Sequence, residues 1–168
     1  RIIAISDGLK PLMESTLETD LAIPAKEANY SFVIPGSASW SWIMKKDDSI
    51  TYDVQKRYID WSAQMKWKYC LVDVNWDTKI GYDKIRELAD YAAQKEVGLI
   101  LWYNSAGSWN TVNYHPKDKL LFDLNRTEEF KRISEIGIKG IKVDFFGGDG
   151  QSMMKYYNDI LQDALKYK

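Results

Sequence analysis

Hydrophobic residues along the chain form two alternating patterns. Near-continuous apolar runs of strand length, typical of strands that are covered on both faces, occur at residues 39–43, 69–74, 97–102 and 141–146. Between and after these runs, apolar residues recur at the spacing of a single helix face. The four stripes consist of Val54, Tyr58, Trp61 and Met65; Ile85, Leu88 and Ala92; Phe130, Ile133 and Ile136; and Tyr157, Ile160, Leu161 and Ala164. This alternation predicts an α/β fold with a parallel sheet and right-handed crossovers.

The alternation begins near residue 37 and divides the chain into two parts. Residues 1–36 lack it: residues 2–5 could form a short strand, and residues 17–21 could be extended or a turn. We therefore expect a lead-in or linker over 1–36 and a domain of parallel β/α units over 37–168. Both ends of the chain resemble the middle of a polypeptide rather than natural termini, so we expect the sequence to be a fragment of a longer protein.

Two architectures fit four β/α units. One is a complete doubly wound domain, and the other is about four of the eight units of a TIM-type (β/α)₈ barrel. The sequence has neither G-x-G-x-x-G after a predicted strand nor G-x-x-x-x-G-K-[ST]. A nucleotide-binding doubly wound domain therefore loses support.

Composition excludes several classes of partner. The 168 residues include 23 Lys and Arg against 24 Asp and Glu, so the net charge of −1 gives no basic footprint for nucleic acid. There is no run of about 20 apolar residues that would span a membrane. One cysteine, Cys70, leaves no internal disulfide. The aromatic share of 14% includes seven Trp and eleven Tyr, and such side chains often line sites for sugars.

Polar and aromatic residues gather where the predicted strands end. In both candidate architectures, ligands bind at the carboxyl ends of the parallel strands. The candidate substrate-binding residues at these ends are Trp40, Trp42, Asp73, Asn75, Trp102, Asn104 and Lys142. Trp76 is a further candidate for an aromatic wall that packs on a sugar ring. These residue types predict a site for a neutral polyhydroxylated ligand.

Asp144 is the candidate catalytic residue. It interrupts the apolar run 141–146, and an ionised carboxylate is rarely buried without a partner or a purpose. Lys142 lies two residues earlier and so shares its strand face. We expect Lys142 to keep Asp144 ionised and to contact a substrate hydroxyl.

Other chemistries have little support in the residue inventory. The single histidine, His115, lies in a predicted loop, and the chain has no cysteine cluster for a zinc site and no G-x-S-x-G motif. No metal ligand is therefore expected on this chain. Glycoside hydrolysis usually needs two carboxyl groups, and no glutamate ends a predicted strand. The glutamates are Glu14, Glu18, Glu27, Glu87, Glu96, Glu128, Glu129 and Glu135.

Four segments resemble glycoside hydrolase family 97, and the most specific is Gly-Ile-Lys-Val-Asp-Phe-Phe around Asp144. The segments are 39–42, 69–73, 98–104 and 137–146. The resemblance implies an N-terminal β-sandwich, a central (β/α)₈ barrel and a small C-terminal β-domain. Residues 1–36 resemble the passage from the sandwich into the barrel, so that 37–168 would be the first half of the catalytic barrel.

The resemblance also implies an activity. The family acts on α-glucosides or α-galactosides, and Asp144 matches the nucleophile of its retaining branch, which includes α-galactosidases. The expected enzyme is therefore an α-galactosidase or an α-glucosidase, and its substrate would be a terminal α-linked galactoside or oligosaccharide. The general acid/base would be a glutamate on a later strand, outside this chain. The resemblance further implies a calcium ion, held mainly by glutamates outside this region, and a periplasmic or secreted location.

Two other interpretations stay open at this point. The chain could be a non-catalytic α/β module that binds a sugar through its aromatic strand ends. It could also be a segment with no activity alone, and half a barrel with open sheet edges is expected to self-associate.

Overall fold

The chain separates into two units, Arg1–Val33 and Ile34–Lys168, and the computed structural model describes residues 2–22, 30–108 and 110–167. In the first unit, α1 (Leu9–Met13) and α2 (Leu17–Asp20) are short helices without buried residues. Residues 2–5 form no strand, so that expectation is wrong. Residues 17–20 form a single short helix followed by a turn at Leu21, so the extended alternative for this stretch is wrong. The buried hydrophobic residues of the described chain all lie in the second unit.

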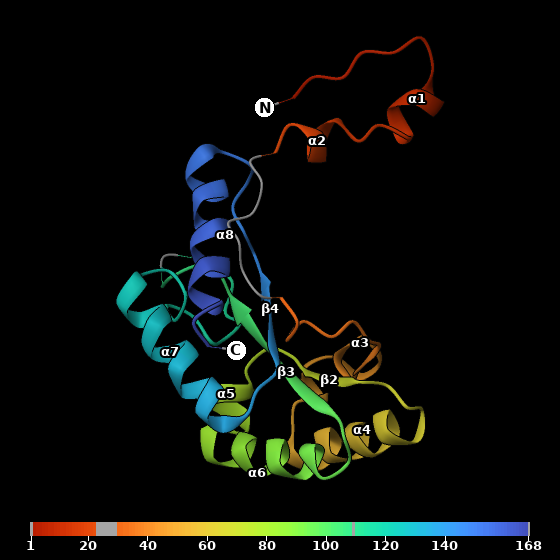
Figure 1. Cartoon of the computed structure of the whole chain (residues 1–168). Coiled ribbons are helices and arrows are strands. Elements are labelled where there is room, and N and C mark those ends of the chain that lie inside the picture. The colour runs from red at the N-terminus through yellow and green to blue at the C-terminus, as the bar shows by residue number, and fades with distance from the viewer. Residues whose placement is uncertain (1, 23–29, 109, 168) are drawn as a thin grey trace. The chain divides into compact units, whose positions relative to one another are not determined.

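The second unit is built on a parallel sheet. Its strands are β1 (Ala38–Trp40), β2 (Tyr69–Val72), β3 (Gly98–Asn104) and β4 (Gly140–Asp144). They pair in the order β1-β2-β3-β4, with every pair parallel (Figure 1). The strands are adjacent in the same order as in the sequence. Right-handed crossovers between such strands place every connecting helix on the same side of the sheet. A doubly wound sheet needs a reversal of strand order, so this sheet is about half of a (β/α)₈ barrel.

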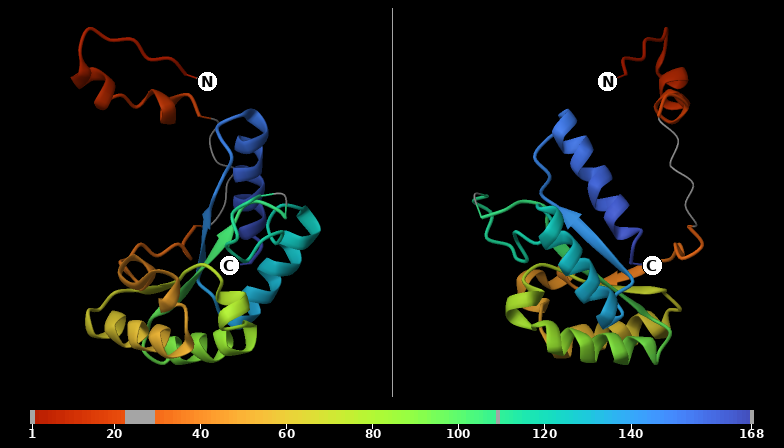
Figure 2. Two further views of the ribbon diagram at one scale, coloured as in Figure 1. Left: turned by 180° about the vertical axis from the view of Figure 1, so that it is seen from behind. Right: turned by 60° about the vertical axis from the view of Figure 1, so that its left-hand side comes forward.

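Helices cover one side of the sheet (Figures 1 and 2). The long ones follow the strands in turn and are α4 (Tyr52–Gln64), α6 (Tyr82–Ala93), α7 (Asp123–Ile136) and α8 (Gln151–Ala164). Short elements precede two of them: α3 (Trp42–Lys45), a 3₁₀ turn (Lys46–Ser49) and α5 (Trp76–Lys79). Successive long helices contact one another. Among the described residues, no helix combines the length and the apolar character that crossing a membrane requires.

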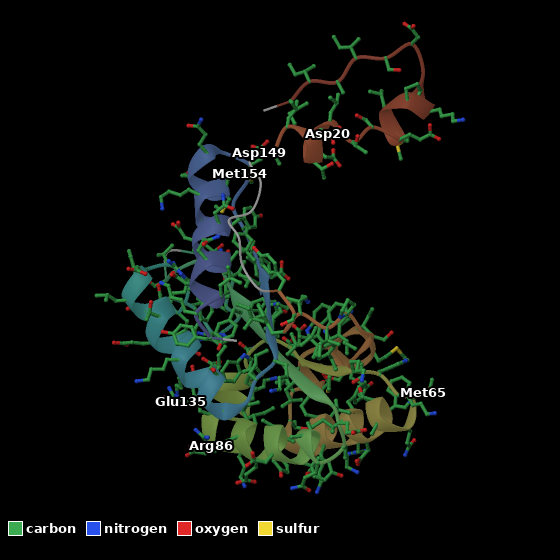
Figure 3. The ribbon with its side chains drawn as sticks, viewed as in Figure 1. Asp20, Met65, Arg86, Glu135, Asp149 and Met154 are labelled. Atoms are coloured by element: carbon green, nitrogen blue, oxygen red, sulfur yellow. The ribbon has the colours of Figure 1, made fainter. Side chains whose placement is uncertain are left out.

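One contact between neighbouring helices illustrates this layer. Arg86 of α6 donates a hydrogen bond of 3.1 Å to the carbonyl oxygen of Glu135 near the end of α7 (Figure 3). The last carbonyls of a helix have no partner within the helix, so a guanidinium from the next helix satisfies one of them.

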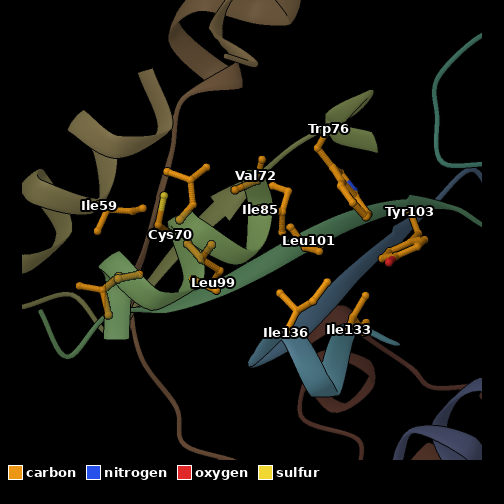
Figure 4. Close-up of a cluster of buried hydrophobic side chains, with 14 of the residues drawn as sticks. Ile59, Cys70, Val72, Trp76, Ile85, Leu99, Leu101, Tyr103, Ile133 and Ile136 are labelled. Carbon is orange, nitrogen blue, oxygen red and sulfur yellow. The ribbon is translucent and has the colours of Figure 1, made fainter. Parts of the chain in front are cut away.

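The hydrophobic core lies between the sheet and the helices (Figure 4). Alternate strand residues point into it, namely Cys70, Val72, Leu99, Leu101 and Tyr103, all at most 1% exposed. They meet buried residues of the helices, which include Ile59 and the predicted stripe residues Ile85, Leu88, Ile133 and Ile136. Burial raises the pKa of the Cys70 thiol to about 11, so this cysteine is an inert packing residue.

Helix α4 packs through a different face from the one predicted. Gln55 and Ser62 are fully buried, whereas Trp61 is 43% exposed and Met65 is 50% exposed. The Ser62 hydroxyl donates to the carbonyl oxygen of Tyr69 on β2 at 2.9 Å. The predicted stripe is wrong here because the face that meets the sheet consists of apolar Ile59 together with the hydrogen-bonded polar side chains of Gln55 and Ser62.

Other differences concern element ends. Trp42 begins α3 rather than ending the first strand, and β3 continues to Asn104, two residues beyond the predicted run. On α8, Leu161 is 62% exposed although Ile160 is buried. The predicted elements themselves, four strands and four long helices in alternation, are all present in the described chain.

Candidate active site

A second set of side chains lies on the sheet face opposite the core. Successive strand residues point to opposite faces, and neighbours in parallel register share a face. The register pairs Trp102 with Lys142 and Asn104 with Asp144. Continued across the sheet, this face carries Trp40, Asp73, Trp102, Asn104, Lys142 and Asp144. The concave side of the half barrel therefore gathers six of the eight residues predicted from sequence.

Asp73 is the centre of a hydrogen-bonded network on this face. Its Oδ2 accepts from Trp40 Nε1 at 2.6 Å and from Lys142 Nζ at 3.2 Å, and its Oδ1 accepts the Val74 N–H at 2.9 Å. The Lys142 ammonium also lies 4.1 Å from the centroid of the Trp40 ring. Asp73 is only 2% exposed, and these three donors satisfy the hydrogen-bonding needs of its buried carboxyl oxygens.

Lys142 thus has a different partner from the one predicted. The expected ion pair with Asp144 is replaced by one with Asp73, whose side chain is 3% exposed. Asp144 is exposed at the end of β4. An ammonium gains more from a desolvated carboxylate than from one in water, because screening weakens the exposed pair.

The backbone fixes Asp144 where β4 ends. Its Oδ1 accepts the Phe145 N–H at 2.8 Å, and its carbonyl oxygen accepts the Ser105 N–H at 2.9 Å. Phe145 has φ of +63°, a left-handed conformation that a bulky residue rarely adopts. Such local strain is typical of functional sites. The turn leaves a held but accessible carboxylate at the carboxyl end of the sheet.

Aromatic rings flank these polar groups. Trp40 and Trp42 stack with centroids 5.8 Å apart and planes 16° apart. Trp102 is 1% exposed and meets the Phe145 ring edge to face, with centroids 5.9 Å apart. Trp40 and Trp42 are half-buried, so they present ring surface beside Asp73, whereas Trp102 forms part of the floor.

Trp76 lies elsewhere. It is fully buried on the helix side, where its ring packs edge to face with Tyr82 and Tyr103 (Figure 4). Its Nε1 donates to the carbonyl oxygen of Trp102 at 2.8 Å. The prediction that Trp76 joins a sugar-facing wall is wrong, because α5 turns this side chain back into the core.

Asn75 and Asn104 hold the segment between β3 and α7. Asn75 exchanges two hydrogen bonds with the backbone of His115, of 2.6 and 2.8 Å. The Asn104 N–H donates to the carbonyl oxygen of Pro116 at 3.0 Å, and its Nδ2 donates to that of Tyr114 at 3.2 Å. Asn104 is fully buried, so in this structure its side chain bonds to the protein backbone rather than facing solvent. A direct contact of either asparagine with substrate stays a prediction.

Asp47 and Tyr114 belong to the site but were missed from the sequence. Asp47 Oδ1 accepts from Trp42 Nε1 at 2.8 Å, and its carbonyl oxygen accepts from Lys79 Nζ at 2.6 Å. The Asp47 charge raises the pKa of the Tyr114 phenol, as do its partial burial and the Asp73 charge. Both residues follow strands in the chain, which is the one signal that could have indicated them.

The described residues hold no group of three or more His, Cys, Asp or Glu side chains suited to a metal ion. The acidic groups at the strand ends are bound to tryptophan, lysine and backbone donors instead. Among the described residues, the site therefore does not fit a calcium ion held by this chain alone. Glu27, one of the glutamates considered above, lies outside the described residues.

Comparison with known proteins places this site in a family. The family model described as Glycoside hydrolase 97 matches residues 36–168. A crystal structure of a beta-arabinopyranosidase superimposes with a TM-score of 0.88 and 43% sequence identity, covering 94% of this chain and 25% of that one.

Two curated relatives match along the chain. A protein named a probable retaining alpha-galactosidase from Streptomyces bingchenggensis is 29% identical, covering 96% of this chain and 25% of the relative. A retaining alpha-galactosidase from Bacteroides thetaiotaomicron is 27% identical, covering 100% of this chain and 26% of the relative. The chain thus spans about a quarter of the length of the curated relatives it matches.

Proposed function

The chain belongs to glycoside hydrolase family 97, and on that premise we propose that it supplies the nucleophile of a retaining, exo-acting α-glycosidase. The observation that carries the proposal is the Asp144 carboxylate. It lies at the carboxyl end of β4 on the concave face, exposed and held by the Phe145 N–H. Barrel enzymes place their catalytic groups at this edge.

The reaction proceeds in two displacements. Asp144 attacks the anomeric carbon, and the bond to the leaving oxygen breaks with its electron pair, while an acid protonates that oxygen. The product is a covalent glycosyl ester on Asp144. Water, deprotonated by the same acid/base group, then attacks the anomeric carbon and frees the carboxylate. Two inversions leave the sugar with its original configuration.

The Asp73 network binds the sugar in this proposal. Asp73 accepts hydrogen bonds from hydroxyl groups, and Lys142 donates to them from the same edge. Trp40 and Trp42 offer apolar ring surface to the C–H face of the sugar. Because Asp73, Lys142 and Trp40 are already joined in the free site, little reorganisation is needed when substrate binds.

The general acid/base comes from the remainder of the protein. Within the described residues, glutamates lie on helices, beside them or in the first unit rather than at strand ends. Glu129 of α7 is 4% exposed and accepts from the phenols of Tyr82 at 2.7 Å and Tyr103 at 2.6 Å, on the helix side. We therefore assign the acid/base, the calcium ligands and the later strands to parts outside this chain. A periplasmic or secreted location belongs to the same proposal.

Substrate specificity has two candidates. The curated relatives carry the name alpha-galactosidase, whereas the structural relative at 43% identity is a beta-arabinopyranosidase. An arabinopyranose ring lacks the hydroxymethyl group of galactopyranose. We place α-galactosides first, because both curated names agree, and arabinopyranosides second, because the identity is higher.

The test replaces the carboxylate by its neutral isostere. In the full-length protein, Asp144→Asn should lower kcat for aryl galactosides by a factor on the order of 10³ or more. Asp90→Asn is the matched control, since Asp90 is exposed on α6. Turnover that survives Asp144→Asn would overturn the assignment. Sugar binding without turnover in the unmodified protein would favour a non-catalytic binding module.

The isolated chain allows a second test, of its activity and its self-association. We expect it to be inactive and to self-associate, because β1 and β4 are both edge strands here and the concave face carries no second half. Sedimentation of the isolated chain tests this expectation, and a monomer with glycosidase activity would contradict it.

A further inference from the structure

The segment that follows β3 carries Tyr114 into the site on a fixed backbone. Hydrogen bonds to Asn75 and Asn104 hold the backbone of His115, Pro116 and Tyr114 at lengths of 2.6 to 3.2 Å. Asn75 has φ of +62°, the left-handed conformation that asparagine tolerates better than most residues. Two strand-end side chains thus fix the position of one loop tyrosine.

Ring contacts fix the Tyr114 side chain beside the proposed nucleophile. Its ring stacks against Phe145, the residue after Asp144, with centroids 6.2 Å apart and planes 29° apart. It also meets the buried Trp102 ring edge to face, at 6.4 Å. The Tyr114 ring therefore stands next to the turn that ends β4.

The phenol of Tyr114 reaches to the other side of the site. The Asp47 and Asp73 charges both act on it and raise its pKa, so the phenol faces these two carboxylates. Asp47 in turn holds Trp42. Asp47 follows β1 and Tyr114 follows β3, the two strands that flank β2, and Asp73 directly follows β2.

We propose that Tyr114 is a substrate-positioning residue that forms the wall of the sugar site on the β2 side. It packs its ring on the terminal sugar, and its position, fixed by Phe145, Trp102 and the two asparagines, closes that side against longer or substituted sugars. The proposal rests on the proposed function, since it deepens the specificity of that site. An aromatic ring suits the C–H face of a pyranose, and a phenol can exchange hydrogen bonds with its hydroxyls.

Kinetics of the full-length protein test the wall. Tyr114→Ala should raise KM for an aryl galactoside about ten-fold, the loss expected for one aromatic contact, with kcat within about three-fold. Tyr114→Phe keeps the ring and should raise KM only about two- to five-fold. The same alanine variant should improve the ratio of kcat/KM for a galactoside substituted at a ring hydroxyl to that for the plain one.

A matched control shows whether the effect comes from the place of Tyr114 in the site or from the loss of a phenol anywhere in the protein. Tyr91→Phe removes a phenol that donates to Asp60 at 2.7 Å on the helix layer, and it should leave both KM and kcat unchanged. An unchanged KM for Tyr114→Ala, or a loss confined to kcat, would overturn the proposal. If the alanine variant fails to fold, Tyr114→Phe decides alone, and a wild-type KM in it would overturn the proposal.

The outcome is independent of the nucleophile assignment. Calorimetry measures galactose binding to Asp144→Asn with and without Tyr114→Phe. The difference in affinity shows whether Tyr114 contacts the sugar, without any turnover. Weaker binding in the double variant supports the wall even if another group proves to be the nucleophile. Equal binding overturns the wall even if Asp144 is trapped as expected.

Discussion

The two faces of one sheet are built from alternate residues of the same strands, and they differ in almost every property. On the helix side, Val72 and Leu101 are fully buried among apolar neighbours. On the concave side, one residue further along each strand, lie Asp73 and Trp102. There Asp73 is paired with Lys142 rather than packed among aliphatic groups.

This difference teaches how stability and chemistry are divided in the molecule. Burial of aliphatic side chains supplies free energy of folding without directional demands. The concave face instead keeps charged groups whose desolvation is offset only by specific partners. Changes on the first face should therefore alter the free energy of unfolding, and changes on the second should alter catalysis.

The largest expected effect on stability comes from the helix side. Leu101→Ala should lower the free energy of unfolding by about 2–5 kcal/mol, because it leaves a cavity in the core. Denaturant unfolding of the full-length protein measures the change. Leu124→Ala, at a residue 76% exposed, is the control and should cost less than about 0.5 kcal/mol. Equal losses in both variants would contradict the division between the faces.

The reverse pattern is expected on the concave side. Lys142→Met should lower kcat/KM by about 10²-fold or more, because a donor aimed at substrate and the partner of Asp73 are lost together. Trp40 and the Val74 N–H still donate to Asp73, and the Lys142 side chain is 32% exposed, so water can take the place of its ammonium. The stability loss should therefore be about 1 kcal/mol.

Lys139→Met is the matched control for that change. Lys139 is exposed and precedes β4, at the opposite end of the strand. Its replacement should leave kcat/KM at the wild-type value. A Lys142 variant that loses stability but keeps its activity would show that Lys142 is a structural residue. That result would contradict the division of stability and catalysis between the two faces of the sheet.

The smallest expected effect lies at the border of the two faces, at Asp77 of α5. Its Oδ1 is buried without a hydrogen-bond partner among the described residues, and burial raises the pKa of this carboxyl above its ordinary value of 3.8. A carboxyl with a raised folded-state pKa contributes stability when protonated, and that stability is lost as pH rises through the folded value.

Asp77→Asn should therefore raise the free energy of unfolding at pH 7 by no more than about 1 kcal/mol, which is measured as a higher unfolding midpoint. The gain should shrink as pH falls from 7 towards 4. Asp83→Asn, at an exposed position of α6, is the control and should show no such trend. A gain that grows as pH falls would reverse the sign of the argument.

The sequence pattern was sufficient for the fold but not for every contact. Strand and helix order followed from apolar periodicity, and strand order in space resolved the choice between the two architectures. The buried face of helix α4 was predicted wrongly because periodicity counts apolar residues, whereas Gln55 and Ser62 are buried through hydrogen bonds. Trp61, expected in the core, lies at the surface beside Trp67.

Site residues on strands were easier to predict than those on loops. Asp73, Lys142 and Asp144 interrupt apolar runs, and a strand's alternation fixes their common face. Tyr114 and Asp47 approach only through the folding of two loops, which no local spacing encodes. The choice of Lys142 between two carboxylates also depended on burial, which is a property of the folded sheet.

The measurement that tests the central claim most directly is covalent trapping of the nucleophile. The full-length protein is incubated with a fluorinated galactosyl donor that carries a good leaving group, then digested, and its peptides are analysed by mass spectrometry. The account predicts one added glycosyl group, located on Asp144 and absent from Asp144→Asn. An adduct on another residue, or hydrolysis that inverts the anomeric configuration without any adduct, would contradict it.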